Sequence, residues 1–262
     1  MDRAVRTRFL DDYRKIRHAE GRGSDDPSYY LALPYRDISG CNAAQWEIRG
    51  RSYRYFERTV LAACERRLGR ALDILDLGAG NGWMSHRLAE RNHKPVALDI
   101  FTDARDGLLA ARRYAPSLPL VEADFDSLPF RGESFDLAIF NASIHYSPDY
   151  GRTLREARRC LRGDGRLVII DSPIYKAREH GERMREERHQ QFERQFGFRS
   201  DAMPSIEFFD EGMLDELARE LRLEWRIHRP WYGWNWALRP WKARLKRRRP
   251  PSRFRILEGV FR

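Results

Sequence analysis

The sequence predicts an α/β fold built on a doubly wound, mostly parallel sheet with helices on both faces. Short apolar segments alternate with segments of helical periodicity, most of the apolar segments end near an acid, and the first breaks into a glycine-rich turn. Segments that are apolar along most of their length are typical of strands covered on both faces. Because ligands bind at the carboxyl ends of such strands, we expect the functional residues there.

The first strand leads into the most informative motif of the chain. Residues 72–77 are followed by Gly78-Ala79-Gly80-Asn81-Gly82 and then by a helical pattern from Trp83 to Arg91. Strand, glycine turn and helix form the arrangement that binds nucleotide-like ligands, because glycine permits a sharp turn and close approach. Trp83 stands where the dinucleotide fingerprint requires its last glycine. The carboxylate of Asp76 suits a cationic ligand better than a pyrophosphate.

The following segments repeat the alternation. Asp99 ends the second strand, 21 positions after Gly78, where an acid can accept bonds from both ribose hydroxyls. The remaining strands are expected at residues 95–99, 120–125, 134–141 and 166–171, with helices at residues 46–68, 83–91, 103–114 and 149–162.

These motifs resemble a known family. Five features occur in the order typical of class I S-adenosylmethionine-dependent methyltransferases: the motif from Asp76 to Gly82, Asp99, Asp124 with Leu128-Pro129-Phe130, Phe135-Asp136, and the segment from Leu161 to Gly165. The closest resemblance is to the type-11 branch, which includes ubiquinone and menaquinone methyltransferases, and it covers about residues 70–172. It implies a Rossmann-like seven-stranded sheet whose last strand is antiparallel. Strands at 221–229 and 254–261, with a helix at 210–220, would complete that sheet.

The resemblance implies S-adenosylmethionine as the cofactor, and the chemistry of the residues assigns its parts. Asp76 and the glycine loop suit the methionine end and the ribose, Asp99 suits the ribose hydroxyls, and Asn141 lies near the methionine tail. Each acid has a structural alternative: Asp76 could bind loop amides, Asp99 could cap a helix, and Asp126 could replace Asp124. The predicted cofactor residues are Asp76, Gly78, Ala79, Gly80, Asn81, Gly82, Asp99, Ile100, Asp124, Phe125 and Asn141.

His145 is the predicted catalytic residue, as a general base just after the fourth strand, because imidazole removes protons near neutral pH. A structural histidine bonded to a carbonyl is the alternative. Aromatic residues that could line the acceptor pocket are Tyr35, Trp46, Tyr146 and Tyr175. No metal site is predicted, since His180 and His189 lie nine residues apart, not three or four.

The chain divides into a predicted N-terminal cap or lid, residues 1–45, and a methyltransferase domain, residues 46–262. Within the domain we expect a substrate-side insertion at 173–209 and an aromatic-basic loop at 230–252. No apolar run approaches the ~20 residues that span a membrane, and the charged N-terminus shows no secretory signal. Three widely spaced cysteines favour a cytoplasmic location.

The expected function is methylation of a small-molecule acceptor at oxygen, carbon or nitrogen. The net charge of +10 and the basic loop leave RNA methylation open, although residues 141–144 lack the Pro-Pro-aromatic sequence of enzymes that methylate base amines. Tryptophans beside arginine and lysine leave a lipid-like acceptor at a membrane surface open as well. A non-catalytic cofactor-binding role is a fourth reading. The sequence does not predict the oligomeric state.

Overall fold

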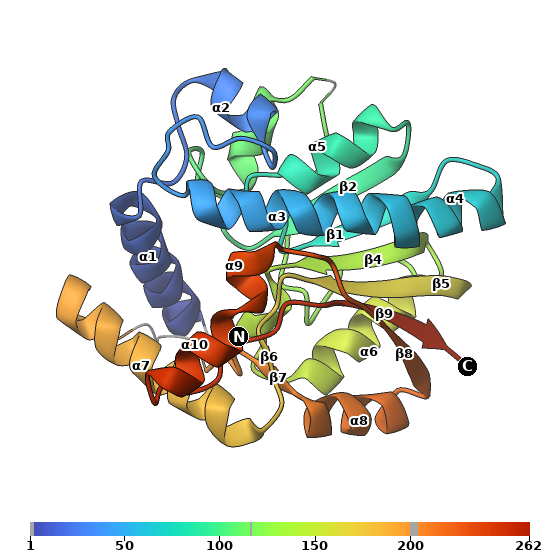
Figure 1. Cartoon of the computed structure of the whole chain (residues 1–262). Coiled ribbons are helices and arrows are strands. Elements are labelled where there is room, and N and C mark those ends of the chain that lie inside the picture. The colour runs from blue at the N-terminus through green and yellow to red at the C-terminus, as the bar shows by residue number, and fades with distance from the viewer. Residues whose placement is uncertain (1–2, 116, 200–203) are drawn as a thin grey trace.

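A seven-stranded sheet forms the centre of the described molecule (Figure 1), in the order β3-β2-β1-β4-β5-β9-β8. The computed structural model describes residues 3–115, 117–199 and 204–262. The neighbours from β3 to β5 pair in parallel, whereas β9 runs antiparallel to both β5 and β8. The predicted topology is therefore confirmed. The strands are β1 (Asp73–Leu77), β2 (Lys94–Asp99), β3 (Leu120–Glu122), β4 (Phe135–Asn141), β5 (Leu161–Ile170), β8 (Leu223–His228) and β9 (Ile256–Phe261).

Helices cover both faces of the sheet. They are α1 (Arg3–Ala19), α2 (Pro27–Ala32), α3 (Ala43–Phe56), α4 (Ala62–Leu68), α5 (Trp83–Glu90), α6 (Tyr150–Cys160), α7 (Arg178–Phe196), α8 (Glu211–Glu220), α9 (Trp234–Ala237) and α10 (Arg239–Leu245). A π-helical segment, Glu57–Leu61, joins α3 to α4, and 3₁₀ turns cover Leu108–Arg113 and Ile144–Tyr146.

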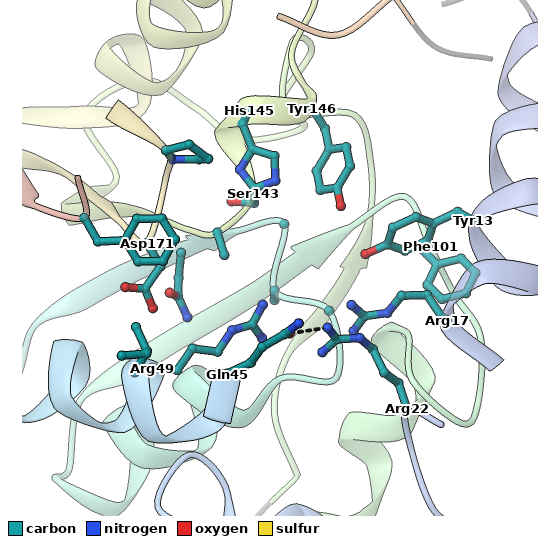
Figure 2. Close-up of a pocket in the computed structure, with 18 of the residues that line it drawn as sticks. Tyr13, Arg17, Arg22, Gln45, Arg49, Phe101, Ser143, His145, Tyr146 and Asp171 are labelled. Carbon is teal, nitrogen blue, oxygen red and sulfur yellow. Dashed lines mark hydrogen bonds between the residues drawn. The ribbon is translucent and has the colours of Figure 1, made fainter. Parts of the chain in front are cut away.

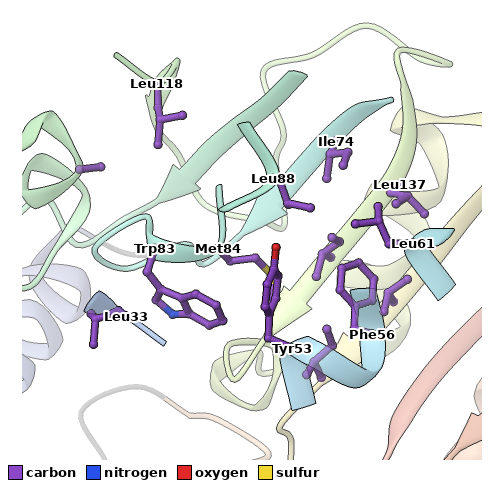
Figure 3. Packing of buried hydrophobic residues seen from close by; sticks show 14 of the residues in the cluster. Leu33, Tyr53, Phe56, Leu61, Ile74, Trp83, Met84, Leu88, Leu118 and Leu137 are labelled. Atoms are coloured by element: carbon purple, nitrogen blue, oxygen red, sulfur yellow. The ribbon is translucent and has the colours of Figure 1, made fainter. Parts of the chain in front are cut away.

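The strands alternate between two buried clusters, as a period of two requires. Leu137 and Ile139 of β4 pack with α3 and α5, whereas Ala138 and Phe140 pack with α6 and α8. Figure 3 shows the first cluster, in which Tyr53 and Phe56 of α3 lie against Ile74 and Leu137. Burial on both faces explains why these strands read as continuous apolar segments.

Two predicted elements differ from the structure. The helix expected at 103–114 is instead a 3₁₀ turn over Leu108–Arg113, because the carboxylate of Asp103 accepts the N–H groups of Arg105 and Asp106 at 2.8 and 2.9 Å. Such local side-chain bonds compete with a helix. The third strand ends at Glu122, and the chain then turns around Asp124, which accepts the N–H of Asp126.

The insertion at 173–209 contains more regular structure than its polar sequence indicated. β6 (Ile174–Tyr175) and β7 (Phe209–Asp210) form a parallel pair around α7. Residues 200–203 of the predicted insertion and residues 1–2 of the predicted cap lie outside the described residues. None of the described helices is long and apolar enough to span a membrane.

The predicted cap, residues 1–45, is not packed uniformly. Tyr29, Tyr30 and Leu33 are buried in the same cluster as Ile74 of β1. α1 lies apart from the sheet in Figure 1, beyond the carboxyl ends of the parallel strands. If residues 1–45 supply a lid, α1 would therefore be its main element. That these residues act as a lid stays a prediction.

Candidate active site

A cavity of about 1490 Å³ opens at the carboxyl ends of the parallel strands. α1, α3, the loops after β1, β2 and β4, and α7 supply its walls. Ten of the eleven predicted cofactor residues line it, together with His145 and Tyr146; the ten are Asp76, Gly78, Ala79, Gly80, Asn81, Asp99, Ile100, Asp124, Phe125 and Asn141. One cavity thus brings together residues from four strand ends.

Two glycines of the loop after β1 serve different purposes. A Cβ on Gly78 would lie 2.4 Å from the Cβ of Ser143, so packing against the loop after β4 excludes a side chain there. A Cβ on Gly80 would meet no protein atom within 4 Å, although the residue has a φ of +55°. Open space beside a cavity-lining glycine is what close approach of a ligand to the backbone requires.

Asp99 holds the end of β2 against the glycine loop. Its Oδ2 accepts the N–H of Gly80 and its Oδ1 accepts the N–H of Phe101, each at 2.8 Å. Burial raises the pKa of Asp99, and the bonds from the amides oppose that rise. The residue therefore orders the loop and also lines the cavity. These bonds go to loop amides and cap no described helix, and binding of the ribose hydroxyls stays a prediction.

Asp76 is a buried carboxylate with one free oxygen. Its side chain is 1% exposed, and Oδ2 accepts a bond from the hydroxyl of Ser85 at 2.7 Å. Oδ1 has no hydrogen-bond partner among the described residues. Burial raises the pKa of Asp76 to about 7. An orphaned carboxylate oxygen in the cavity wall fits a cationic ligand, since a positive charge would restore the ionised form.

The loops after β3 and β4 supply the other predicted groups. The carboxylate of Asp126 accepts a bond from Thr153, whereas the carboxylate of Asp124 has as its hydrogen-bond donor, among the described residues, the N–H of Asp126. Asp124 is thus freer than its competitor to bind a ligand. The Oδ1 atom of Asn141, at the end of β4, is buried and has no partner within the described part of the chain.

A group of arginines that the sequence analysis did not single out faces the same cavity. Figure 2 shows Arg17, Arg22 and Arg49 along one side, with Gln45 bonded to Arg22. Arg22 is 5% exposed, and its Nη1 has no partner among the described residues. Burial, followed by the charges of Arg22 and Arg17, lowers the pKa of Arg49. Such mutual repulsion favours an anionic group between these side chains.

His145 lies across the cavity from these arginines, next to Tyr146 (Figure 2). Its Nδ1 is buried without a partner in the described structure. Burial, and then the charges of Arg188 and Arg49, lower the pKa of His145 to about 3. The imidazole is therefore neutral at physiological pH and a weak base. The carbonyl of His145 accepts the N–H of Glu207 at 2.9 Å, which joins it to the insertion.

Asp171, just after β5, is a further buried acid in the cavity wall, and it was not among the predicted site residues. It is 6% exposed, bonds to the hydroxyl of Ser52, and leaves Oδ2 without a partner among the described residues. Burial raises its pKa to about 6. Ser52 in turn lies 2.8 Å from the hydroxyl of Tyr232, which comes from the aromatic-basic loop.

Four predicted residues lie outside the cavity lining. Gly82 begins α5 and packs toward Ala111. Trp46 is 2% exposed and packs edge-on against Trp83 in the core. Tyr35 lies at the surface beneath the guanidinium groups of Arg54 and Arg87, and Tyr175 is buried against Phe208 and Arg249. Of the four predicted pocket aromatics, the structure places only Tyr146 at the cavity. Tyr13 of α1, which was not predicted there, packs edge-on against it.

Comparison with known proteins agrees with this geometry. Residues 75–169 match the family model described as a methyltransferase domain. A sarcosine/dimethylglycine N-methyltransferase of Halorhodospira halochloris is 34% identical over 120 residues, which cover 44% of this chain and 43% of that protein. A malonyl-[acyl-carrier protein] O-methyltransferase of Erwinia pyrifoliae is 32% identical, covering 39% and 38%, respectively. A ubiquinone/menaquinone biosynthesis C-methyltransferase of Rhizobium rhizogenes is 26% identical, covering 45% and 48%. The chain thus spans less than half the length of these relatives.

Solved structures show the same fold. The 1,6-didemethyltoxoflavin-N1-methyltransferase of Burkholderia thailandensis, solved with 1,6-didemethyltoxoflavin and S-adenosylhomocysteine bound, has a TM-score of 0.50 at 20% identity, covering 90% of this chain and 86% of that one. A protein of Pyrococcus horikoshii OT3 has a TM-score of 0.53 at 21% identity, covering 89% and 98%.

The fold, the glycine loop and the acids at the strand ends are those of class I S-adenosylmethionine-dependent methyltransferases. Within that fold class, residues 75–169 match a methyltransferase domain, and this part of the chain is similar to the curated relatives. No group of three or more His, Cys, Asp or Glu side chains within the described ranges could hold a metal ion.

Proposed function

We propose that this protein transfers the methyl group of S-adenosylmethionine to a small-molecule acceptor inside the cavity. The observation that carries the proposal is the open space at Gly80, in a cavity that Asp76 and Asp99 also line. Bound there, the cofactor supplies an electrophilic methyl group on a positively charged sulfur. The relatives that share the domain are named for transfer to nitrogen, oxygen and carbon, so the domain alone does not select the acceptor atom.

Each of these cavity residues would bind the part of the cofactor that complements its charge. Asp76, with its free oxygen, would bind the ammonium of the methionine moiety, and Asp99 would accept bonds from the ribose hydroxyls. Arg22, which pairs with Glu20 through Nε, and Arg49 would bind the methionine carboxylate, because Nη1 of Arg22 has no partner among the described residues and no ion pair of Arg49 occurs there. Asp124 would accept a bond from the adenine amino group. Each assignment pairs a polar group of the cavity wall with its chemical complement, and the free Oδ1 of Asp76 and Nη1 of Arg22 have no other partner among the described residues.

The acceptor would occupy the part of the cavity between the cofactor and α7. Alignment of the nucleophile with the methyl group supplies much of the catalysis in such a displacement. A proton that leaves the acceptor would pass to Asp171, because a carboxylate with a pKa of about 6 is a stronger base than an imidazole with a pKa of about 3. Neutral His145 would then orient the acceptor through a hydrogen bond.

The glycine loop offers a direct test. We expect Gly80→Val to abolish measurable S-adenosylhomocysteine binding in calorimetry, because the branched side chain would fill the space left open in the cavity. Gly69→Val is the matched control: Gly69 has a φ of +63°, meets nothing within 4 Å, and lies at the end of α4, outside the cavity lining. Equal affinity in both variants would contradict the proposed site.

Turnover then tests the reaction itself. The wild-type protein should convert S-adenosylmethionine to S-adenosylhomocysteine when fractionated small-molecule extracts are added, and mass spectrometry should find a product heavier by one methylene. Activity that survives only in RNA-containing fractions, and is lost after ribonuclease treatment, would contradict the small-molecule assignment.

A further inference from the structure

The segment from Trp231 to Leu245 carries an apolar stripe that faces solvent. The stripe consists of Trp234, Leu238, Trp241 and Leu245, which are 75%, 44%, 64% and 66% exposed. Their spacings of four, three and four residues are those of neighbours on a helix surface. α9 and α10 are separate helices that meet at Leu238, whose N–H bonds to the carbonyl of Trp234 and whose carbonyl accepts the N–H of Lys242.

The stripe is the largest gathering of exposed apolar side chains along the described sequence. With Trp231, at 58% exposed, this segment supplies half of the ten large hydrophobic residues exposed in the described structure. Of the other five, Leu31, Tyr35 and Ile38 lie within one short segment, and Val5 and Ile227 lie elsewhere. Single exposed apolar residues are ordinary, whereas a concentrated group marks an interaction surface.

The exposure of the stripe is not the result of a loose segment. On its inner side, Trp236 packs against Tyr232 and Phe254, and the guanidinium of Arg239 stacks on Trp236 at 3.6 Å. Beyond α10, Arg249 bonds to Glu187 of α7 at 2.6 Å. In Figure 1, α10 lies beside α7, and α9 lies next to α10 in front of the sheet. The two helices are therefore held in place while the four apolar side chains remain exposed.

Basic side chains surround the stripe. Exposed residues of this kind are Lys242, Arg244, Lys246, Arg247 and Arg248, and none of them forms an ion pair with another described residue. No aspartate or glutamate occurs between Glu224 and Glu258. An exposed apolar stripe flanked by unneutralised cations complements a surface that is apolar below and anionic above.

From this arrangement we infer that α9 and α10 dock the protein on an anionic lipid surface. The stripe enters the boundary between headgroups and acyl chains, and the five basic side chains bind the lipid phosphates. Gly233, Trp234 and Arg239 also line the catalytic cavity, so docking holds the cavity opening against the bilayer. The inference concerns a surface and does not depend on the proposed methyl transfer.

Flotation of the full-length protein with lipid vesicles tests the inference. We expect binding to phosphatidylcholine vesicles that contain phosphatidylglycerol, weak binding to phosphatidylcholine alone, and release by high salt. The triple variant Leu238→Ser/Trp241→Ser/Leu245→Ser, whose positions lie outside the cavity lining, should bind at least about tenfold more weakly. Leu31→Ser/Ile38→Ser, which removes exposed apolar side chains elsewhere, should float like the wild type.

A charge pair separates electrostatic from apolar binding. Lys242→Glu/Lys246→Glu should lose the preference for phosphatidylglycerol, whereas Arg66→Glu/Lys94→Glu, which makes the same charge change at exposed positions outside this segment, should retain it. Circular dichroism and S-adenosylhomocysteine binding confirm that each variant is folded. Absence of flotation by the wild type, or equal flotation of the stripe variant, overturns the inference. Concentration-dependent dimers that the stripe variant abolishes, without vesicle binding, would show instead that the stripe joins two copies of the chain.

Discussion

Replacing Asp76 by asparagine should stabilise the ligand-free protein and weaken its binding of the cofactor. The carboxyl group of Asp76 has a pKa of about 7 in the fold, against 3.8 ordinarily, because burial disfavours its charge. A shift of roughly 3 units corresponds to about 4 kcal/mol of folding free energy that is lost when the group ionises. Asparagine avoids this loss but places an amide N–H₂ where Oδ1 has no partner, at a cost of about 1–3 kcal/mol. The expected net gain at alkaline pH is therefore about 1–3 kcal/mol.

The sign of the pH dependence makes this prediction specific. Between the ordinary and the raised pKa, the folded protein holds a proton on Asp76 that the unfolded chain has released, so wild-type stability falls by about 1.4 kcal/mol per pH unit. Above about pH 7 Asp76 is ionised in both states, so its contribution to the free energy of unfolding no longer changes with pH. The stability difference between Asp76→Asn and the wild type should thus grow from about pH 4 to about pH 7 and then stay constant.

Urea denaturation of both proteins across this pH range measures the difference directly, because contributions from Asp171 and other acids are common to both. Added S-adenosylhomocysteine should stabilise the wild type far more than the variant. A stability difference that does not change with pH would refute the reasoning, and so would a variant that is less stable than the wild type above pH 7.

Three further predictions follow from the described contacts. Asp99→Ala should weaken S-adenosylmethionine binding by about 1–3 kcal/mol in calorimetry, and unchanged affinity would remove Asp99 from the ribose site. Burial acts to raise the pKa of Asp136, but bonds from Arg70 and Arg162 hold this pKa below its ordinary value, so the ionised carboxylate should stabilise the fold above the ordinary pKa and lose this effect as the pH falls. Asp136→Asn should lower the free energy of unfolding by about 2–3 kcal/mol, whereas Asp164→Asn, at an exposed position, should lower it by less than about 1 kcal/mol. If Asp171 takes the acceptor proton, Asp171→Asn should lower turnover about 10²–10⁴-fold, and the rate of the wild type should fall as the pH drops below about 6. A larger loss of turnover in His145→Gln, together with a wild-type rate that does not change around pH 6, would favour His145 as the base instead.

The order of strands and the cofactor loop could be read from the sequence because both depend on local patterns. Apolar segments of strand length fix the sheet, and the glycines after Leu77 fix where the loop turns. Asp99 and Asp124 follow from the rule that parallel strands end at one edge. Asp171 satisfies the same rule after β5, so the same reasoning would have found it.

The arginines could not be found in this way. Arg22 comes from a loop and Arg49 from α3, and nothing in their local sequence shows that they face the end of β1. Trp46 illustrates the opposite error: it lies on the same helix as Arg49, but a sequence with aromatic residues on several sides does not show which of them faces the core. The structure buries Trp46 and turns Arg49 to the cavity.

His145 shows why the chemistry of a site is harder to predict than its position. It follows β4 and lines the cavity, yet its basicity depends on burial and on groups far away in sequence. Arg49 of α3 and Arg188 of α7 act on the same imidazole, and together with burial they lower its pKa to about 3. The N–H of Glu207 fixes its backbone from the insertion. A residue type indicates which proton transfers are chemically available, whereas burial and the packing of distant segments determine the pH at which they occur. An insertion that moved Arg188 away would raise the pKa of His145 only in part, because burial, the largest cause, and Arg49 would remain.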